Sequence, residues 1–346
     1  MKGHNERGVA EIHGGKVLVF GDLHLSSSFV GQHKNYQYEC YANMDKIQSL
    51  VEENKASAVI FLGDLVGVNE KNIKDRQFLM RTQHFFTMLN KVTNGKVFSV
   101  KGNHDMGDFT DFDFFEGLGY IKNPEYIDYY RDESSDVKTL EIRFHLVNYG
   151  DEKKRLHLAD ENWSSNVVLG HSDYYIDGVT NWYSANNNIE VSDLTNFEGV
   201  QYIFSGHIHT PSEEMLFTTL KNGESIGLFF LGSPSRTSER FDDCWYMVFE
   251  YRVEDGEGAT SYDSHLMGLE PASEVFYDKG EFVGEESEEE EVRQNNSDKL
   301  TSIVKEIMDG RIMTGDIQRQ IEVVPYASDE VKAIAKKYLE MASQVK

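Results

Sequence analysis

Short apolar stretches separated by amphipathic segments organise the first hundred residues of the chain. Three stretches have the length of buried strands, and the apolar residues between them recur at helical spacing. The expected strands are Lys16–Phe20, Ala58–Leu62 and Lys96–Val100, and the expected helices are Asn43–Glu53 and Phe78–Val92. The first part of the chain is therefore predicted to follow the order β-α-β-α-β.

From Leu140 onward the pattern changes to a succession of strand-length apolar stretches with few helical segments between them. These stretches are Leu140–Val147, Asn166–Leu169, Tyr202–Phe204, Ile226–Leu231 and Cys244–Tyr251. Together the two halves predict an α/β fold, in which a two-sheet sandwich has helices on its outside.

The composition changes again after Arg252, where Asp, Glu, Gly and Ser dominate. We expect residues 1–253 to form the main domain, 254–282 a reduced cap-like region, and 283–296, with the acidic cluster Glu285–Glu291, a solvated linker. Residues 297–346 contain two segments with apolar residues at i, i+3, i+4, i+7 and i+8. This small helical segment either packs back on the core or docks on a partner protein.

Composition and charge narrow the classes of function. With 346 residues, 39% of them hydrophobic, the chain can bury a sizeable core. Its net charge of −25 argues against a nucleic-acid groove built on bulk positive charge alone. We expect neither a secretory signal nor a membrane span. Cys40 and Cys244 match no metal or redox spacing, so a reducing cytoplasm is the expected location.

Five short strings supply the residue types of a metal site. They are Gly-Asp-Leu-His at 21–24, Gly-Asp at 63–64, Gly-Asn-His-Asp at 102–105, Gly-His at 170–171 and Gly-His-Ile-His at 206–209. A carboxylate that follows a strand and a glycine lies at the C-terminal edge of a sheet, where α/β proteins bind ligands. A two-metal centre needs such a carboxylate to bridge ions about 3.5–4 Å apart. The strings therefore predict a two-metal phosphoesterase centre.

In this order the strings resemble the motifs of the calcineurin-like metallophosphoesterase superfamily, over roughly residues 16–250. The resemblance implies two divalent ions, Mn²⁺ first and Fe²⁺, Zn²⁺ or Mg²⁺ as alternatives. It implies seven ligands: Asp22, His24 and His209 on one ion, Asn103, His171 and His207 on the other, and Asp64 bridging both.

The resemblance also assigns catalytic roles to two residues of the Gly-Asn-His-Asp string. His104 would protonate the leaving oxygen or stabilise the charged transition state, and Asp105 would hold the His104 imidazole in its useful tautomer. The nucleophile would be a hydroxide activated by both ions, so that no serine or cysteine nucleophile is needed.

Within the superfamily the chain most resembles the SbcD-type DNA repair exonucleases, in the compact form that phages carry. Gly21–Leu25, the string Gly232–Thr237 and the tethered C-terminal segments carry this resemblance. It implies a homodimeric exo- or endonuclease subunit that works in DNA repair or recombination, in the cytoplasm or a phage's host cytoplasm. An SbcC-like coiled-coil ATPase would bind the C-terminal helices. Arg236 and Arg240 are candidates for contacts with DNA phosphates.

Two other functions remain open from the residues themselves. After Gly63-Asp64 the chain has Leu65-Val66-Gly67, without the further aspartate that many SbcD-like nucleases carry. The acidic charge and the reduced cap favour a phosphodiesterase or phosphatase that acts on small molecules or nucleotides. A scaffold that keeps the metals for structure alone is the third hypothesis, and the complete ligand set argues against it.

Overall fold

The computed structural model describes the residues that form one compact unit ending at Phe276. Described are residues 7–27, 33–67, 73, 75–107, 110–131, 138–159, 164–177, 179–180, 189–235, 243–254 and 257–276, the side chains of 253, 254, 257 and 258 excepted. The acidic linker, the C-terminal helical segment, Arg236 and Arg240 lie outside these residues, and so do the predictions made for them.

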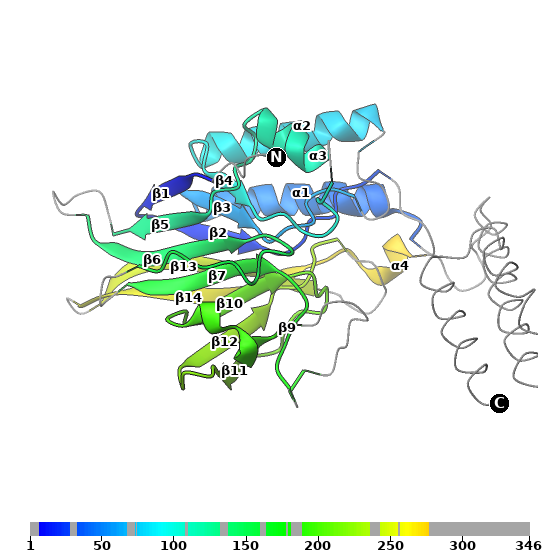
Figure 1. Ribbon diagram of the computed structural model, residues 1–346. Helices are drawn as coiled ribbons and strands as arrows, with labels where there is room; N and C mark the ends of the chain where they lie inside the picture. Colours follow the sequence, from blue (N-terminus) through cyan, green and yellow to red (C-terminus); the bar gives the residue numbers. More distant parts are fainter. Residues whose placement is uncertain are drawn as a thin grey trace, which may run out of the picture. The chain divides into compact units, whose positions relative to one another are not determined.

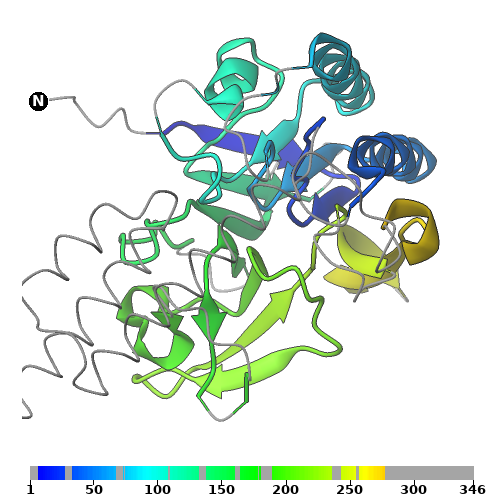
Figure 2. The same cartoon turned by 90° about the vertical axis from the view of Figure 1, so that its right-hand side faces the viewer.

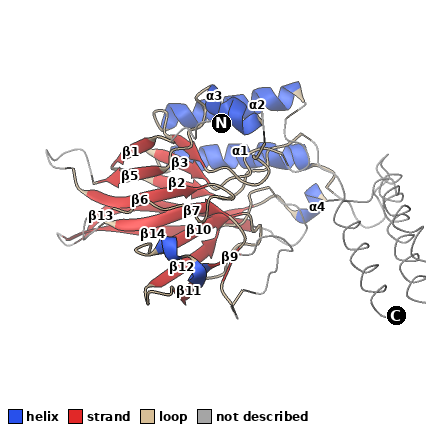
Figure 3. Cartoon of the chain, viewed as in Figure 1, coloured by secondary structure: helices blue, strands red, loops and turns tan. Residues whose placement is uncertain are grey.

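The smaller of the two main sheets has five strands in the order β14-β13-β2-β3-β4. Its parallel strands are β2 (Val17–Phe20), β3 (Ala58–Phe61) and β4 (Val97–Ser99). Strand β13 (Asp243–Glu254) runs antiparallel to β2, and β14 (Glu257–Gly268) pairs with β13 along its whole length. Figures 1 and 3 show β13 and β14 passing behind strands β6 and β7 of the larger sheet, which is described next.

The larger sheet has seven strands in the order β1-β5-β6-β7-β10-β12-β11. Parallel pairing joins β6 to β7, β7 to β10 and β10 to β12, so the C-terminal ends of these strands share one edge. The strands are β1 (Val9–His13), β5 (Tyr126–Tyr130), β6 (Leu140–Val147), β7 (Ser165–His171), β10 (Tyr202–Gly206), β11 (Leu216–Thr219) and β12 (Ser225–Phe230). A separate pair joins β8 (Tyr174–Tyr175) to β9 (Ile189–Glu190).

Three helices, α1 (Tyr36–Glu53), α2 (Arg76–Val92) and α3 (Asp111–Gly117), cover the outer face of the five-stranded sheet. Viewed along their axes, α1 and α2 lie side by side (Figure 2). The Asp75 side chain accepts a hydrogen bond from the Phe78 N–H at 2.8 Å and caps α2, and Thr110 caps α3 in a capping box. The short elements η1 (Val191–Asp193), η2 (Thr195–Phe197) and α4 (Ala272–Val275) complete the described helices.

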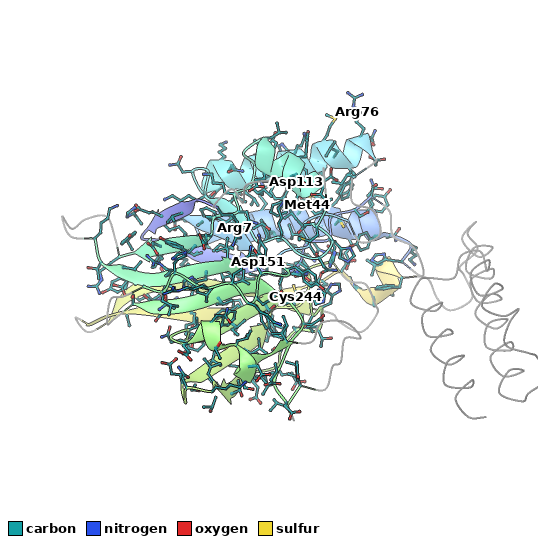
Figure 4. All side chains as sticks on the ribbon, in the orientation of Figure 1. Arg7, Met44, Arg76, Asp113, Asp151 and Cys244 are labelled. Carbon is teal, nitrogen blue, oxygen red and sulfur yellow. The ribbon has the colours of Figure 1, made fainter. Side chains whose placement is uncertain are left out.

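Successive side chains of a strand point to opposite faces of its sheet, and this divides the core into layers. In β2, Leu18 and Phe20 face the helices, whereas Val17 and Val19 face the seven-stranded sheet. Because β2 and β3 are buried on both faces, all their residues are apolar, as is typical of covered parallel strands. Figure 4 draws the side chains and labels Met44 of α1 and Cys244 of β13, both in the layer beneath the helices. A third apolar cluster lies on the far face of the seven-stranded sheet.

The predicted α/β two-sheet sandwich with flanking helices is confirmed, and every strand expected from the apolar stretches is present. Six further strands of the described part, β1, β5, β8, β9, β11 and β14, were not expected. The expected boundary at residue 253 falls inside the β13–β14 pair, so Glu257–Gly268 belongs to the sandwich and not to a cap. In the part of the chain that the structure describes, no helix combines the length and apolar character needed to cross a bilayer.

Candidate metal centre

The five motifs meet because each follows the C-terminal end of a parallel strand. Asp22, Asp64 and Asn103 follow β2, β3 and β4, His171 ends β7, and the last motif follows β10. The two sheets present these ends at a common edge, since His171 Nδ1 lies 3.6 Å from Asp22 Oδ1. The candidate centre therefore spans both layers of the sandwich.

One group of ligand atoms comes from Asp22, His24 and His209, whose ligand-type atoms all lie within 4.8 Å of one another. Asp22 Oδ2 lies 3.5 Å from His209 Nε2 and 3.9 Å from His24 Nε2. The two imidazole Nε2 atoms are 2.8 Å apart. This is the trio that the sequence predicted for one ion.

A second group consists of Asn103, His171 and His207. Asn103 Oδ1 lies 2.9 Å from both His171 Nε2 and His207 Nδ1, and these two ring nitrogens are 3.1 Å apart. The structure thus brings together the trio predicted for the other ion, with one amide oxygen and two imidazole nitrogens converging on a single point.

Asp64 lies between the two groups. Its Oδ2 is 3.2 Å from His171 Nε2 and 3.7 Å from His24 Nε2, while its Oδ1 accepts a hydrogen bond from the His104 backbone N–H at 2.8 Å. One carboxylate oxygen therefore faces both groups, which is the position that a bridging ligand requires.

Backbone conformation aims three of these side chains inward. His24, Asp64 and His207 have φ angles of 45°, 42° and 73°, in the left-handed region that non-glycine residues seldom occupy. Two hydrogen bonds hold the turns: the His207 N–H donates to Asp22 Oδ2 at 2.8 Å, and the His24 N–H donates to the Asp64 carbonyl at 2.7 Å. Such outliers persist only where the surrounding structure stabilises them, commonly at functional sites.

At two positions, one motif approaches another so closely that only glycine fits. A Cβ atom on Gly102 would lie 2.7 Å from Asp64 Cγ, and one on Gly206 would lie 2.6 Å from the Leu62 carbonyl oxygen and 3.1 Å from Asp22 Cγ. Asn103 and His207 are each preceded by glycine for this reason: an aspartate that follows a neighbouring strand occupies the space that a side chain at the glycine position would need.

Main-chain carbonyls fix two of the rings. His171 Nδ1 lies 2.8 Å from the Leu62 carbonyl oxygen, and His24 Nδ1 lies 3.4 Å from that of Gly67. A proton on Nδ1 that faces a carbonyl leaves Nε2 free to act as a ligand. Both rings consequently present Nε2 to the centre.

Neighbouring charges determine the ionisation of each group in the centre. Burial opposes ionisation of Asp64, but the His171 and His24 imidazoles outweigh it and hold the Asp64 pKa well below its usual value. Burial alone would lower the pKa of His171, yet Asp64 and Asp22 raise it well above the usual value. Burial and the neighbouring His24 lower the pKa of His209 to about 4. Near pH 7 the metal-free chain thus holds ionised carboxylates, a protonated His171 and a neutral His209.

These residues fit two divalent ions. Asp22 is fully buried, and its Oδ1 has no hydrogen-bond partner among the described residues, a costly arrangement unless a cation compensates it. The mixture of imidazole, carboxylate and amide donors suits Mn²⁺, Fe²⁺ or Zn²⁺ better than Ca²⁺.

Metal affinity is expected to increase with pH through neutrality. Below its raised pKa, His171 carries a proton on Nε2 that must leave before this atom can bind an ion, so each unit of pH should change the affinity about tenfold for one released proton. His209, with a pKa of about 4, contributes only in acid. Calorimetric titration with Mn²⁺ in two buffers of different ionisation enthalpy measures the proton count. An enthalpy independent of the buffer would contradict this expectation.

His104 lies at the edge of the centre with 39% of its side chain exposed, and its Nε2 is 4.0 Å from Asp64 Oδ2. The expected link from Asp105 to this ring is not seen. The Asp105 carboxylate accepts hydrogen bonds from the Gly102 N–H at 2.9 Å and the Leu65 N–H at 3.1 Å. Burial and the charge of Asp64 raise the pKa of Asp105 to about 7. Asp105 therefore anchors the two ligand-bearing loops and does not orient His104.

Two residues beside the centre were not anticipated from the sequence. Asp173 Oδ1 lies 2.9 Å from His207 Nε2, and the Tyr149 ring centroid lies 5.8 Å from that of His207. The acidic residue two places after His171 could have drawn attention to Asp173. Tyr149 follows β6 and belongs to no recognisable motif. Its position after the C-terminal end of a strand was the one indication that it lies near the centre.

Comparison with solved structures finds likenesses at low sequence identity. TT1561 of Thermus thermophilus is 11% identical, with 72% of this chain and 98% of that chain covered and a TM-score of 0.37. A metallophosphoesterase from Sphaerobacter thermophilus is 12% identical, with coverages of 74% and 89% and a TM-score of 0.32. Vacuolar protein sorting 29 from Cryptosporidium parvum is 14% identical, with coverages of 73% and 99% and a TM-score of 0.27. No curated protein matches the chain in sequence.

The comparison with family models gives a match that includes the whole candidate centre. The model of the calcineurin-like phosphoesterase family matches residues 15–211, more than half of the chain, and this range runs from the residues before Asp22 to those after His209. Its members are metal-dependent phosphoesterases, which agrees with the two ligand groups found at the edge of the sheets. The chain therefore belongs to the calcineurin-like phosphoesterase family.

Proposed function

We propose that this phosphoesterase is the nuclease subunit of an SbcD-type complex and hydrolyses DNA phosphodiester bonds with two bound Mn²⁺ ions. The observation that carries the proposal is the assembled centre, in which Asp64 Oδ2 lies 3.2 Å and 3.7 Å from imidazoles of the two ligand groups. Seven ligands in this arrangement equip the chain for phosphoester hydrolysis. The DNA substrate rests on the resemblance to SbcD-type nucleases.

The segment that resembles SbcD after the last motif contributes to the wall of the centre. Ser233 Oγ donates a hydrogen bond to the Asp22 carbonyl oxygen at 2.9 Å, and a Cβ on Gly21 would lie 3.0 Å from the carbonyl carbon of Gly232. The Gly-Ser-Pro-Ser string thus supports the loop that holds the first ligand. We propose, from the resemblance to SbcD-type nucleases, that Arg236 and Arg240 contact DNA phosphates.

The exposure of the ligands indicates the side from which a phosphodiester approaches. The side chains of Asp22, His24, Asp64 and His171 are at most 2% exposed, whereas those of His207 and His209 are 19% and 23% exposed. His104 is the most exposed of the group. A substrate phosphate would therefore meet the centre on the face formed by these last three imidazoles.

When bound, the two ions supply an activated water nucleophile and neutralise charge on the phosphoryl oxygens. The chain's own residues hold and orient the reacting groups. Asp64 keeps its carboxylate between the two ligand groups, and His104 lies where its Nε2 can reach an oxygen of the substrate. A hydrogen bond from His104 to the leaving oxygen or to the developing phosphorane would lower the barrier.

Charge supports a role for a partner in DNA binding. The chain has 34 basic and 59 acidic residues, so its overall field repels DNA at long range. We propose that an SbcC-like ATPase, bound through residues 297–346, supplies the positive surface, and that the complex is built on a homodimer in the cytoplasm. The same acidity favours a second candidate function, hydrolysis of small or nucleotide phosphodiesters.

Hydrolysis of an end-labelled linear DNA duplex with Mn²⁺ tests the proposal, with a small aryl phosphodiester assayed in parallel. We expect DNA cleavage by the wild-type chain and none by Asp64→Ala, because this substitution removes the oxygen that faces both ligand groups. Cleavage should increase when an SbcC-like ATPase and ATP are added. Rapid turnover of the small diester with intact DNA under all these conditions would contradict the nuclease and support the second candidate.

A further inference from the structure

We propose that Asp173 is a positioning residue that holds the His207 imidazole so that Nδ1 faces the second ion. Asp173 Oδ1 lies 2.9 Å from His207 Nε2, on the side of the ring opposite the centre. This proposal rests on the two-ion centre of the proposed function and assigns a role to a residue outside the five motifs.

Burial and the closeness of His207 single out this carboxylate. Asp173 is 5% exposed, its Oδ1 makes no aligned hydrogen bond within the described part of the chain, and His207 Nε2 lies 2.9 Å from this oxygen. The separation is that of a charge-assisted hydrogen bond, although the oxygen is not aligned with the ring N–H. Such contacts commonly align only when a site is loaded. A buried carboxylate would be unfavourable here unless this contact compensated it.

His207 needs such a support more than His24 or His171 does. Its φ of 73° places it on a strained turn, and its side chain is 19% exposed at the rim. The rings of His24 and His171 are fully buried and face main-chain carbonyls through Nδ1. His207 is therefore the ligand of the second group whose orientation depends on a side chain.

A carboxylate at Nε2 has a defined effect on the ring. It keeps the proton on Nε2, leaves the Nδ1 lone pair available for the ion and increases the basicity of Nδ1. His207 Nδ1 already lies 2.9 Å from Asn103 Oδ1 and 3.1 Å from His171 Nε2, so the atom that the carboxylate favours is the one that faces the ligand group. Loss of a carboxylate partner of this kind typically costs roughly 10- to 100-fold in metal affinity.

Calorimetric titration of the metal-free full chain with Mn²⁺ tests the proposal without any substrate. We expect two binding events in the wild type, and in Asp173→Ala a roughly 10- to 100-fold loss in one event only. Asp173→Asn retains the side-chain volume and an oxygen that accepts a hydrogen bond, so it should recover part of the loss. Asp177→Asn is the matched control, because Asp177 is an exposed aspartate four residues later.

Two outcomes overturn the proposal. One of them rejects the role of Asp173 alone, and the other also rejects the two-ion centre. Two wild-type events that both weaken equally in Asp173→Ala, or that do not weaken at all in this variant, reject the positioning role and leave the proposed function intact. A wild-type chain with fewer than two events rejects the two-ion centre and therefore both proposals. Thermal unfolding of each metal-free variant confirms that Asp173→Ala and Asp173→Asn are compared in the folded state.

Discussion

Replacing Gly102 by alanine is expected to reduce phosphoester hydrolysis by about 100-fold or more. The new Cβ would lie 2.7 Å from Asp64 Cγ, and the Gly102 N–H also donates a hydrogen bond to Asp105 Oδ2 at 2.9 Å. The loop must move away from β3 to admit the methyl group, and this movement displaces Asp64 and the neighbouring Asn103 together. A displacement of about 1 Å in a catalytic constellation is enough to cost 10²-fold.

Gly117→Ala is the matched control for this substitution. Gly117 ends α3, and a Cβ at this position would meet no atom within 4 Å. We expect Gly117→Ala to retain wild-type activity and metal content, whereas Gly102→Ala should lose bound Mn²⁺ as measured by elemental analysis. Both proteins should show the same far-ultraviolet circular dichroism. Wild-type metal content and activity in Gly102→Ala would show that the close approach to Asp64 is not required.

The central architecture was predictable because the strands that carry the ligands are buried on both faces. Val17–Phe20 and Ala58–Phe61 are continuous apolar stretches of strand length, and each ends in a glycine-acid pair that the sheet places at one edge. His171 and His207 follow the same logic in the second sheet. Spacing alone did not predict that the motifs of the two sheets would meet. That prediction came from the resemblance to a family.

Edge strands account for the main error in the fold. Among the described strands, Glu257–Gly268 is the outermost of its sheet, a position where polar residues are favoured. Its Ser, Thr and Asp residues therefore gave it the composition of a linker. The dipeptide Asp255-Gly256, which typically connects the strands of a hairpin, was the available indication.

Residues that act through a contact distant in sequence were the hardest to predict. Asp105 was expected to orient its neighbour His104, but its carboxylate accepts from the Leu65 and Gly102 N–H groups. Asp173 contacts His207 from a strand end 34 residues earlier in the chain. Motif spacing gives the identity of ligands, whereas the partners that hold them depend on how the loops fold over one another.

Replacing His104 by alanine is expected to separate metal binding from catalysis. Asp64 Oδ1 accepts its hydrogen bond from the His104 backbone N–H at 2.8 Å, and alanine retains this donor. The imidazole is 39% exposed and belongs to neither ligand group. Two bound Mn²⁺ ions should therefore remain while the hydrolysis rate falls by roughly 10²- to 10⁴-fold, the usual contribution of a positioned acid or hydrogen-bond donor.

The pH profile of the wild type distinguishes the two roles of His104. Burial lowers its pKa, so near pH 7 the ring is neutral and can donate a hydrogen bond without a positive charge. We therefore expect the rate to remain high above neutral pH, where a protonated general acid would be lost. His84→Ala removes an exposed imidazole from α2 and serves as the control, with activity unchanged. A metal-loaded His104→Ala variant with wild-type rates would exclude the imidazole from the chemistry and reassign charge stabilisation to the ions alone.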